Sequence, residues 1–554
     1  MKPRILCLIG ITKCLVVLMA LTGIIAARDA DASTIYVNAA GNSPSPNGAS
    51  WQTAFISLQD ALDAAVPGDQ IWVAQGAYIP TKIYAPNGVT GGASGLNTPS
   101  LKTFNLPDQI AIYGGFAGTE HSVSQRRPDI YHTVLSGLTP TGQSWHVVIA
   151  GNDVAQTGVT TTLDGLTISD GNAQGPSPDI FFSPFTYSHN IGGGLLAVFG
   201  SETNLNNVRF VNNAAAVEGG GILSINCTLN VANSYFSQNS AGLEGGAIEV
   251  LNTYQGNVSY AATIASSTFD GNTATVFGGA IVGEGTLPND NSTVDINNCL
   301  FQNNTSMEGG AIVFDSQRSS VRMSRFDQNV ATVNAGAMST TNIVDTIVNA
   351  VFFGGSHVFT KFTTTVSLCT FTNNIAEGDQ SQHDVMLGGL AAGLDFPLGG
   401  GALVAYMNGY LDVTNSTFVN NVTQNGPGGA ILNGRAAAEN VFGTGVDVFE
   451  VSTSVARCFF SGNQAPGGNG GAIASLPAST FAIPERTVAD TILSATTSRF
   501  LGNSTGGNGG AIYLDESTAT LNADVYSTNH AALGNSIYGI DSIINGSSTT
   551  PFIR

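Results

Sequence analysis

Short runs of alternating apolar and polar residues recur along the chain, separated by residues that favour turns. Runs such as STFDGN and GGAIVGEG alternate with period two and are rich in Gly, Asn, Thr and Val. They are too short for helices, in which apolar positions repeat every three to four residues. Strands of a few residues, punctuated by Gly and Asn, have this pattern. The pattern therefore predicts an all-β protein built from short strands.

Within this pattern, a short signature that pairs an aromatic with a polar residue, Phe-x-x-Asn, occurs nine times. A tenth copy has Tyr526 in place of the Phe and Asn529 as its Asn. The nine Phe/Asn pairs are Phe210/Asn213, Phe236/Asn239, Phe269/Asn272, Phe301/Asn304, Phe326/Asn329, Phe371/Asn374, Phe418/Asn421, Phe460/Asn463 and Phe500/Asn503.

A second signature, Gly-Gly-Ala-Ile, follows the aromatic residue by eight to ten positions in most copies. Its glycine pairs are Gly245-Gly246, Gly278-Gly279, Gly309-Gly310, Gly428-Gly429, Gly470-Gly471 and Gly509-Gly510. Variants stand at Gly219-Gly220, Ala335-Gly336 and Gly400-Gly401, and after Phe371 the second signature is delayed by an insertion running to about residue 399.

The spacing of the two signatures predicts a solenoid. Successive Phe residues are 26, 33, 32, 25, 45, 47, 42 and 40 residues apart. Such steps fit stacked coils with loops of variable length inserted into them. The steps of 40 or more leave open a second interpretation, in which an extra coil without the signature is hidden between two marked ones.

Stacking would place equivalent residues of successive coils about 4.8 Å apart, so that like residues form ladders. We expect the Phe to form an internal column and the Asn to lie in a bend with left-handed φ, where amides bond one another and the backbone. The Gly pair fits the opposite bend. The residue two before each Phe should also point inward, and in eight of nine copies it is Ser or Cys: Ser234, Ser267, Cys299, Ser324, Cys369, Ser416, Cys458 or Ser498.

The segment before the repeats has a different pattern. Leu58, Ala61, Leu62 and Ala65 have helical spacing, Pro67-Gly68-Asp69 interrupts it, and the strand-like IWVA follows. A short amphipathic helix of this kind can cap the open end of a β-solenoid, which otherwise exposes apolar core and unpaired strand edges.

The coupled GGAI and FxxN signatures, over roughly residues 160 to 530, resemble the repeats of the polymorphic outer membrane proteins. These are autotransporter surface proteins of certain intracellular bacteria. The N-terminal stretch, with IYVNAA, LQDALDAA and IYGGFAGTE, is similar to the opening of many secreted bacterial β-helix proteins. The resemblance implies a right-handed parallel β-helix and an adhesin-like surface role with self-association.

The chain stops at Arg554 without the alternating strands of the family's translocator barrel. We therefore expect release, attachment through a partner, or a longer product.

Residues 1–32 have the pattern of a secretory signal peptide. Lys2, Arg4 and Lys13 precede or flank an apolar run, and Ala30-Asp31-Ala32 supplies the small residues of a cleavage site. No later segment has the length of apolar sequence that a membrane helix needs. Four cysteines remain after the leader, at wide spacing that indicates neither a metal site nor a disulfide framework.

Charge excludes one class of partner. The formal net charge is -20, and only 10% of residues are charged. A nucleic-acid partner is not expected, because neutralising phosphates requires clustered Lys and Arg.

Candidate catalytic chemistry is sparse. Glu218 and Glu244 stand directly before the glycine pair on consecutive coils, and Glu308 has the same place further along. Stacked carboxylates about 5 Å apart would suit a retaining glycosidase. Phe277 and Asn334 occupy the same place in other coils, which favours the simpler interpretation of solvated turn residues. Arg209, Arg325 and Arg499 could serve as a lyase base, but no dense acidic cluster accompanies them in the sequence.

The sequence thus predicts a signal peptide at 1–32, a cap with the first coils at 33–159, a β-helix at 160–540 and a tail at 541–554. We expect no cofactor and no metal. The favoured function is non-catalytic binding of a cell-surface glycan or protein by a secreted or outer-membrane-associated chain. A polysaccharide lyase or glycoside hydrolase and a structural envelope component are the alternatives.

Overall fold

The computed structural model describes residues 33–83, 99–151, 157–175, 189–198, 200–252, 259–285, 292–342, 361–379, 381, 398–406, 409–434, 437–438, 447–448, 451–477, 491–546 and 552–553. The expected signal peptide lies outside these residues. Among the described residues, no helix is long and apolar enough to cross a membrane.

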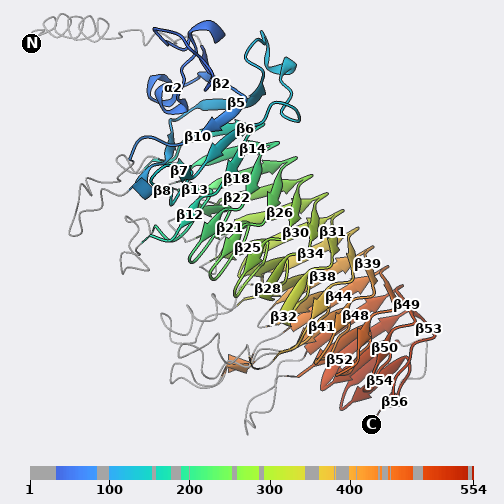
Figure 1. The fold of residues 1–554 in the computed structure, drawn as a ribbon. Coiled ribbons are helices and arrows are strands. Elements are labelled where there is room, and N and C mark those ends of the chain that lie inside the picture. Colours follow the sequence, from blue (N-terminus) through green and yellow to red (C-terminus); the bar gives the residue numbers. More distant parts are fainter. Residues whose placement is uncertain are drawn as a thin grey trace, which may run out of the picture.

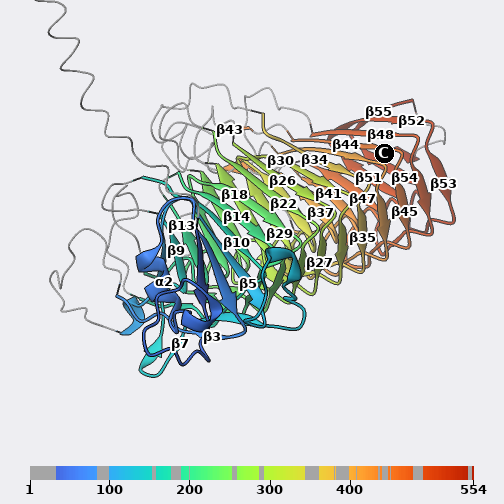
Figure 2. The same cartoon turned by 90° about the horizontal axis from the view of Figure 1, so that it is seen from above.

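The fold is a right-handed parallel β-helix, as the resemblance implied. Four long sheets run along the stack, and each takes one short strand from successive coils (Figures 1 and 2). Sheet 1 has 15 strands, sheet 2 has 13, sheet 3 has 10 and sheet 4 has 14 within the part of the chain that the structure describes. Two small antiparallel hairpins, β7 (Leu138–Thr139) with β8 (Gly142–Gln143) and β42 (Ala437–Ala438) with β43 (Asp447–Val448), stand outside the four sheets.

The strands of sheets 1 and 2 are as follows. Sheet 1 contains β1 (Thr34–Val37), β2 (Gln70–Ala74), β5 (Ile110–Phe116), β10 (Thr160–Asp164), β14 (Glu202–Asn206), β18 (Thr228–Ala232), β22 (Ala261–Ala265), β26 (Thr293–Asn297), β30 (Arg318–Arg322), β34 (Thr363–Ser367), β38 (Tyr410–Thr414), β44 (Val451–Ala456), β48 (Thr491–Thr496), β52 (Ser517–Asn522) and β55 (Ile543–Asn545). Sheet 2 contains β3 (Gly76–Tyr78), β6 (Thr133–Ser136), β11 (Thr167–Ser169), β15 (Arg209–Val211), β19 (Tyr235–Ser237), β23 (Thr268–Asp270), β27 (Leu300–Gln302), β31 (Arg325–Asp327), β35 (Thr370–Thr372), β39 (Thr417–Val419), β45 (Phe459–Ser461), β49 (Arg499–Leu501) and β53 (Val525–Ser527).

The strands of sheets 3 and 4 complete each coil. Sheet 3 contains β12 (Asn172–Ala173), β16 (Ala214–Ala215), β20 (Ser240–Ala241), β24 (Thr273–Ala274), β28 (Thr305–Glu308), β32 (Val330–Asn334), β36 (Ile375–Ala376), β40 (Val422–Thr423), β46 (Gln464–Ala465) and β50 (Ser504–Thr505). Sheet 4 contains β4 (Phe104–Leu106), β9 (Val148–Ala150), β13 (Leu195–Ala197), β17 (Ile222–Ile225), β21 (Ile248–Asn252), β25 (Ile281–Gly285), β29 (Ile312–Asp315), β33 (Met338–Thr341), β37 (Leu403–Ala405), β41 (Ile431–Gly434), β47 (Ile473–Leu476), β51 (Ile512–Asp515), β54 (Ile537–Ile540) and β56 (Phe552–Ile553).

The predicted Phe column is confirmed and forms the centre of the core. Rings of successive coils, from Phe210 through Phe500 to Tyr526, lie nearly parallel with centroids 4.7 to 5.1 Å apart. The column belongs to one continuous apolar cluster that extends from Ile35 to Ile537. Burial of like aromatic residues at the strand spacing therefore holds the coils in register.

The Asn residues of the signature form a second ladder inside the stack. All of them are buried, and the ladder consists of Asn213, Asn239, Asn272, Asn304, Asn329, Asn374, Asn421, Asn463, Asn503 and Asn529. Each side chain from Asn213 to Asn503 donates to the amide oxygen of the next, at 2.9 to 3.0 Å. The same nitrogen also donates to a backbone carbonyl, as Asn239 does to Phe210 at 3.0 Å. The ladder amides thus satisfy backbone groups that are buried with them.

The prediction that the ladder Asn itself occupies the bend is wrong by one residue. Asn239, Asn374, Asn421 and Asn463, like the other ladder residues, do not have left-handed φ. The bend is made by the residue before each of them: Gln238 with φ of 55°, Asn373 with 55°, Asn420 with 54° and Gly462 with 64°. The shift has a physical reason, because the ladder Asn must point inward to bond its neighbours and the turn then falls on the residue before it.

The predicted Ser and Cys column is also confirmed. Its eight members are nearly or fully buried. Where the member is Ser, its hydroxyl accepts a hydrogen bond from the backbone N–H of the equivalent residue one coil earlier, as Ser324 does from Cys299 at 3.1 Å. The three thiols are free, and burial raises the pKa of Cys299, Cys369 and Cys458 to about 11. These cysteines are packing residues with no tendency to ionise at neutral pH.

The two glycines of each pair are needed for different reasons. Gly278 has φ of +58°, which disfavours a side chain. Gly279 approaches the next coil so closely that an added Cβ would lie 2.3 Å from the carbonyl oxygen of Gly310. Both expected causes, positive φ and close backbone approach, are therefore present, one at each position.

Among the described strands, no extra coil lies between the marked coils of the longer repeats. Phe326 pairs directly with Phe371, and Phe371 pairs with Phe418. Phe418 likewise pairs with Phe460, and Phe460 with Phe500. The marked coils on either side of each long step are therefore direct neighbours in the stack.

The N-terminal cap has the predicted order of elements. Helix α2 (Leu58–Ala64) begins after Ser57, whose hydroxyl accepts a hydrogen bond from Gln59 N–H. Leu58 and Leu62 are buried in the core cluster, and strand β2 follows. Figure 1 shows α2 at the N-terminal end of the stack. The helix thus covers apolar residues of the first coils.

Candidate functional site

The Phe and Asn residues of the repeat signature form the interior of the stack. The ladder Phe and Asn side chains are almost completely buried, and their contacts are with the same residue of neighbouring coils. Asn239, Asn374, Asn421 and Asn463, for example, are 0% exposed. Such residues present no group to a ligand. A functional site must therefore be sought on the outward faces of the sheets.

The outward face of sheet 4 is unusual because most of it is apolar. The residue after the Ile of each GGAI signature points away from the core. In register along the sheet these residues are Ile149, Leu196, Leu223, Glu249, Val282, Val313, Ser339, Val404, Leu432, Ala474, Tyr513 and Tyr538. Two separate apolar clusters form on this face, one around Leu223 and one around Tyr406. Glu249 interrupts the apolar column between them.

Acidic side chains gather around Glu249, and we refer to this group as the carboxylate cluster. Glu218 pairs with Glu244 at the turn before sheet 4, Glu244 pairs with Phe277, and Phe277 pairs with Glu308. The register predicted for these turn residues is confirmed. On the strands, Glu284 of β25 pairs with Asp315 of β29. The full cluster is Glu218, Glu244, Glu249, Glu284, Glu308 and Asp315.

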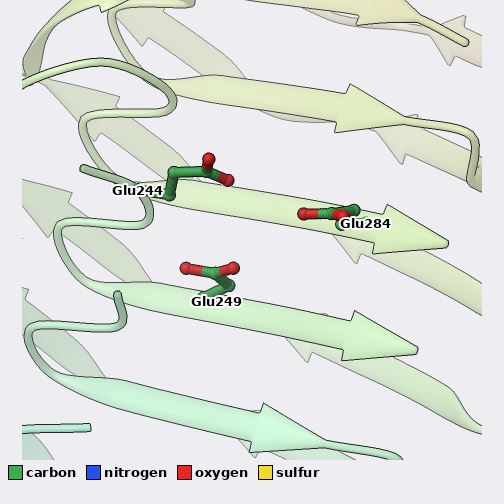
Figure 3. Close-up of side chains that lie close together, drawn as sticks. All are labelled: Glu244, Glu249 and Glu284. Atoms are coloured by element: carbon green, nitrogen blue, oxygen red, sulfur yellow. The ribbon is translucent and has the colours of Figure 1, made fainter. Parts of the chain in front are cut away.

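Three members approach one another closely. Carboxylate oxygens of Glu244, Glu249 and Glu284 all lie within 4.8 Å of one another (Figure 3). Glu249 is 1% exposed, whereas Glu244 and Glu284 are partly exposed. No ion pair between described residues includes any of the three. No described basic side chain would therefore balance their negative charges when they are ionised.

Burial and mutual repulsion favour the protonated forms. Burial, and then the charge of Glu218, raises the pKa of Glu244 to about 8. Burial, and then the charges of neighbouring carboxylates, raises the pKa of Glu249 and of Glu284 well above the usual value. Burial also raises the pKa of Glu218. Each cause penalises the ionised carboxylate relative to water.

Glu308 differs because it has hydrogen-bond donors. Its Oε1 accepts from the Ser339 hydroxyl at 2.6 Å and from the Tyr406 hydroxyl at 2.7 Å. Burial raises the pKa of Glu308 to about 7, although these donors lower it in part. Glu308 is 2% exposed, so its interpretation as a solvated turn residue is wrong. Glu308 resembles a turn residue in the sequence, but in the fold it is buried against Ser339 and Tyr406 on the outward face of sheet 4.

The structure brings the two candidate glutamates together but leaves the candidate arginines elsewhere. Glu218 and Glu244 are neighbours at the edge of sheet 4. Arg209, Arg325 and Arg499 lie on the outward face of sheet 2 and are exposed there, as predicted. Arg325 pairs with Asp327 at 2.8 Å, and Arg209 lies over the Tyr235 ring. No lyase site combining these arginines with the glutamates is formed.

Sequence reasoning missed Glu249 and Glu284. A signal was present, since Glu249 follows the Ile of GGAI at a place that other coils fill mainly with Leu, Val, Ala or Tyr. A charged residue in an apolar column indicates a special environment. Glu284 lies on the next strand, two residues beyond Val282, the neighbour of Glu249.

The repeat signature itself has known counterparts. Residues 266–284, 457–476 and 497–515 match the model of the Chlamydia polymorphic membrane protein repeat. Three segments of the chain are therefore similar to this repeat. Each matched segment begins at a bend with left-handed φ, at Ser266, Arg457 or Thr497, and ends in a strand of sheet 4. The polymorphic membrane protein repeat thus covers the passage through sheets 2, 3 and 4, and the first match ends at Glu284.

No curated protein matches the sequence. The catalytic unit of a thermostable GH87 alpha-1,3-glucanase from Streptomyces thermodiastaticus strain HF3-3 is 12% identical with a TM-score of 0.38, over 90% of this chain and 68% of that chain. The PL6 family alginate lyase AlyGC is 9% identical with a TM-score of 0.16, over 94% of this chain and 98% of that chain.

Proposed function

We propose that this chain is a surface-exposed or secreted β-helix protein that binds a cell-surface glycan or partner protein without chemical turnover. The observation that carries the proposal is the presence of polymorphic membrane protein repeats at three places. The repeat residues build the interior, so that outward residues, which vary from coil to coil, are free to recognise a ligand. The proposal includes self-association of the chain through the same outward residues that bind the ligand.

Sheet 1 offers the most suitable face, and we refer to one column on it as the polar stripe. Its residues in register are Asn204, Asn230, Thr263, Asp295, Ser320, Thr365, Asp412, Ser454, Ser494 and Thr520. All ten are short polar side chains, and none is buried. Neighbours bond one another, as Asn230 does to Asn204 at 2.9 Å. A flat row of hydroxyl, amide and carboxylate groups can hydrogen-bond an extended glycan or a polar protein surface.

Location is the first test of this proposal. An antibody against residues 200 to 530 should label intact producer cells or detect the protein in the medium. A periplasmic signal alone, with no labelling of intact cells, would contradict surface exposure.

A glycan-cleaving enzyme is a second candidate because Glu218 and Glu244 stack on consecutive coils and the pKa of Glu244 is raised. A raised pKa suits a general acid. If this candidate is right, the purified protein should release reducing ends or unsaturated products from an acidic or neutral glycan. Glu244→Gln should then reduce the rate at least roughly a hundredfold, the usual minimum for loss of an acid catalyst. Binding to a glycan panel with no product release would support the non-catalytic proposal instead.

A further inference from the structure

The carboxylate cluster contains a buried carboxyl group with an oxygen that has no hydrogen-bond partner, and a structural role does not explain it. Glu249 is 1% exposed, and its Oε2 has no hydrogen-bond partner. An unpaired carboxylate buried in this way is unfavourable. The neighbouring coils show that the position does not require an acid, since Leu223 and Val282 occupy it on either side.

The two nearest carboxylates lie where they could share a positive charge with Glu249. Glu244 precedes β21 in the same coil, and Glu284 comes from β25 in the next coil. Figure 3 shows the three side chains on the same side of the ribbon, with the carboxylates of Glu244 and Glu249 next to each other and Glu284 further along β25. Because Glu244 and Glu284 are partly exposed, an ion could reach the group from solvent.

The spacing and the donor type select a class of ion. Oxygen ligands of one Ca²⁺ are each about 2.3 to 2.6 Å from it, so that two of them are at most about 5 Å apart. The three carboxylates, within 4.8 Å of one another, fall inside this limit. Mg²⁺ requires shorter, strictly octahedral bonds, and Zn²⁺ favours nitrogen and sulfur ligands. Three glutamates, each able to give one or two oxygens, match the flexible coordination of Ca²⁺.

We propose that Glu244, Glu249 and Glu284 bind one Ca²⁺ that ties two neighbouring coils together on the outward face of sheet 4. Glu218 and Asp315 pair with Glu244 and Glu284 respectively, and they add negative charge on either side. The bound ion replaces the missing partner of Glu249 and offsets the repulsion within the cluster. This site is independent of the proposed ligand-binding role, because it lies on sheet 4 and the polar stripe lies on sheet 1.

The test is calorimetric titration of the chelator-treated protein with Ca²⁺. We expect saturable binding of one Ca²⁺ per chain with a dissociation constant of roughly 10⁻⁴ to 10⁻³ M, the range of extracellular modules. Ca²⁺ should also raise the unfolding temperature, since it binds the folded state. Glu249→Gln should weaken binding at least tenfold. Glu202→Gln makes the same chemical change at an exposed position on sheet 1 and should bind as the unchanged protein does.

Folding of the variants can be checked in chelator alone. Glu249→Gln should be at least as stable there as the unchanged protein, because glutamine is always neutral, whereas burial penalises the ionised form of Glu249. Glu284→Gln, at a partly exposed position, provides the same binding readout if Glu249→Gln does not fold. The proposal is overturned if no saturable Ca²⁺ binding occurs at millimolar concentration, or if the folded variants bind unchanged. Equal or tighter binding of Mg²⁺ would overturn the assignment to Ca²⁺.

Discussion

At the residue scale, the ladder Asn links neighbouring coils through both its amide oxygen and its amide nitrogen. The Asn304 amide oxygen accepts from the backbone and side-chain N–H groups of Asn272, both at 3.0 Å. Its amide nitrogen donates to the Phe269 carbonyl at 3.0 Å and to Asn329 at 2.9 Å. Both polar atoms of the Asn304 side chain thus form hydrogen bonds to neighbouring coils, and the side chain is completely buried. Such fully satisfied buried networks are sensitive to the loss of one member.

Asn304→Ala should therefore destabilise the protein by about 3 kcal/mol or more, because it removes hydrogen bonds from buried donors and acceptors of the two neighbouring coils. Chemical denaturation followed by circular dichroism measures this difference. Asn297→Ala, at an exposed position on β26 of the same coil, is the control and should change stability by less than about 0.5 kcal/mol. Equal effects of the two substitutions would show that the ladder bonds do not stabilise the stack.

At this scale the sequence identified which residues repeat but not how each one is used. The Phe and the Ser/Cys columns followed from alternation, since period two decides which side chains face inward. The bend was misplaced by one residue because Asn suits both a left-handed φ and a buried amide ladder. The residues before it, among them Asn212, Gln238 and Asn303, show that the left-handed position accepts several types.

At the element scale, the turn before sheet 4 sets how closely coils can approach. Gly279 lies against the carbonyl oxygens of Gly310 and Thr305, 2.3 and 2.6 Å from the place of an added Cβ. Gly271, at the bend between β23 and β24 in the same coil, has φ of +65° and open space around it. Substitution of Gly279 therefore tests the close approach of the coils, and substitution of Gly271 tests the left-handed backbone conformation alone.

Gly279→Ala should destabilise the protein by about 3 kcal/mol or more, since the backbone of a neighbouring coil must move to admit the methyl group. Gly271→Ala should cost only about 1 kcal/mol, the penalty for a left-handed residue with a Cβ. Thermal unfolding of the two variants side by side measures the contrast. A milder effect at Gly279 than at Gly271 would contradict the close approach of the coils.

Elements of the candidate site were only partly predictable. The pairing of Glu218 with Glu244 followed from the repeat register, because both precede the same glycine pair. The contribution of Glu284 could not be inferred, since it depends on two strands lying side by side with Glu284 further along its strand than Glu249. The burial of Glu308 depends on Tyr406, which is distant in sequence and reaches it across the face of sheet 4.

At the scale of the whole molecule, the residues that stabilise the stack lie inside it, and the residues available for recognition lie on its outward faces. The interior ladders repeat nearly unchanged, while the outward columns differ from sheet to sheet. Sheet 4 carries buried apolar clusters and acidic residues on its outward side, whereas sheet 2 exposes scattered arginines and sheet 1 exposes the polar stripe. Coils stacked in one dimension allow such division, because each contacts mainly its neighbours.

Binding of a cell surface by the outward face of sheet 1 is the central claim, and a matched pair of variants tests it. Thr263→Arg with Thr365→Arg places two bulky cations on the polar stripe. Thr268→Arg with Thr370→Arg makes the same change on the next strand of each coil, in the sheet 2 column where Arg325 already stands. Both pairs of substitutions are expected to fold.

The measurement is saturable binding of the purified, labelled protein to intact cells that display surface glycans and proteins. We predict saturable binding of the unchanged protein and of the sheet 2 variant, and at least roughly tenfold weaker binding of the sheet 1 variant, as removal of central contacts in an interface produces. Absence of saturable binding, or equal binding by the two variants, would contradict the claim.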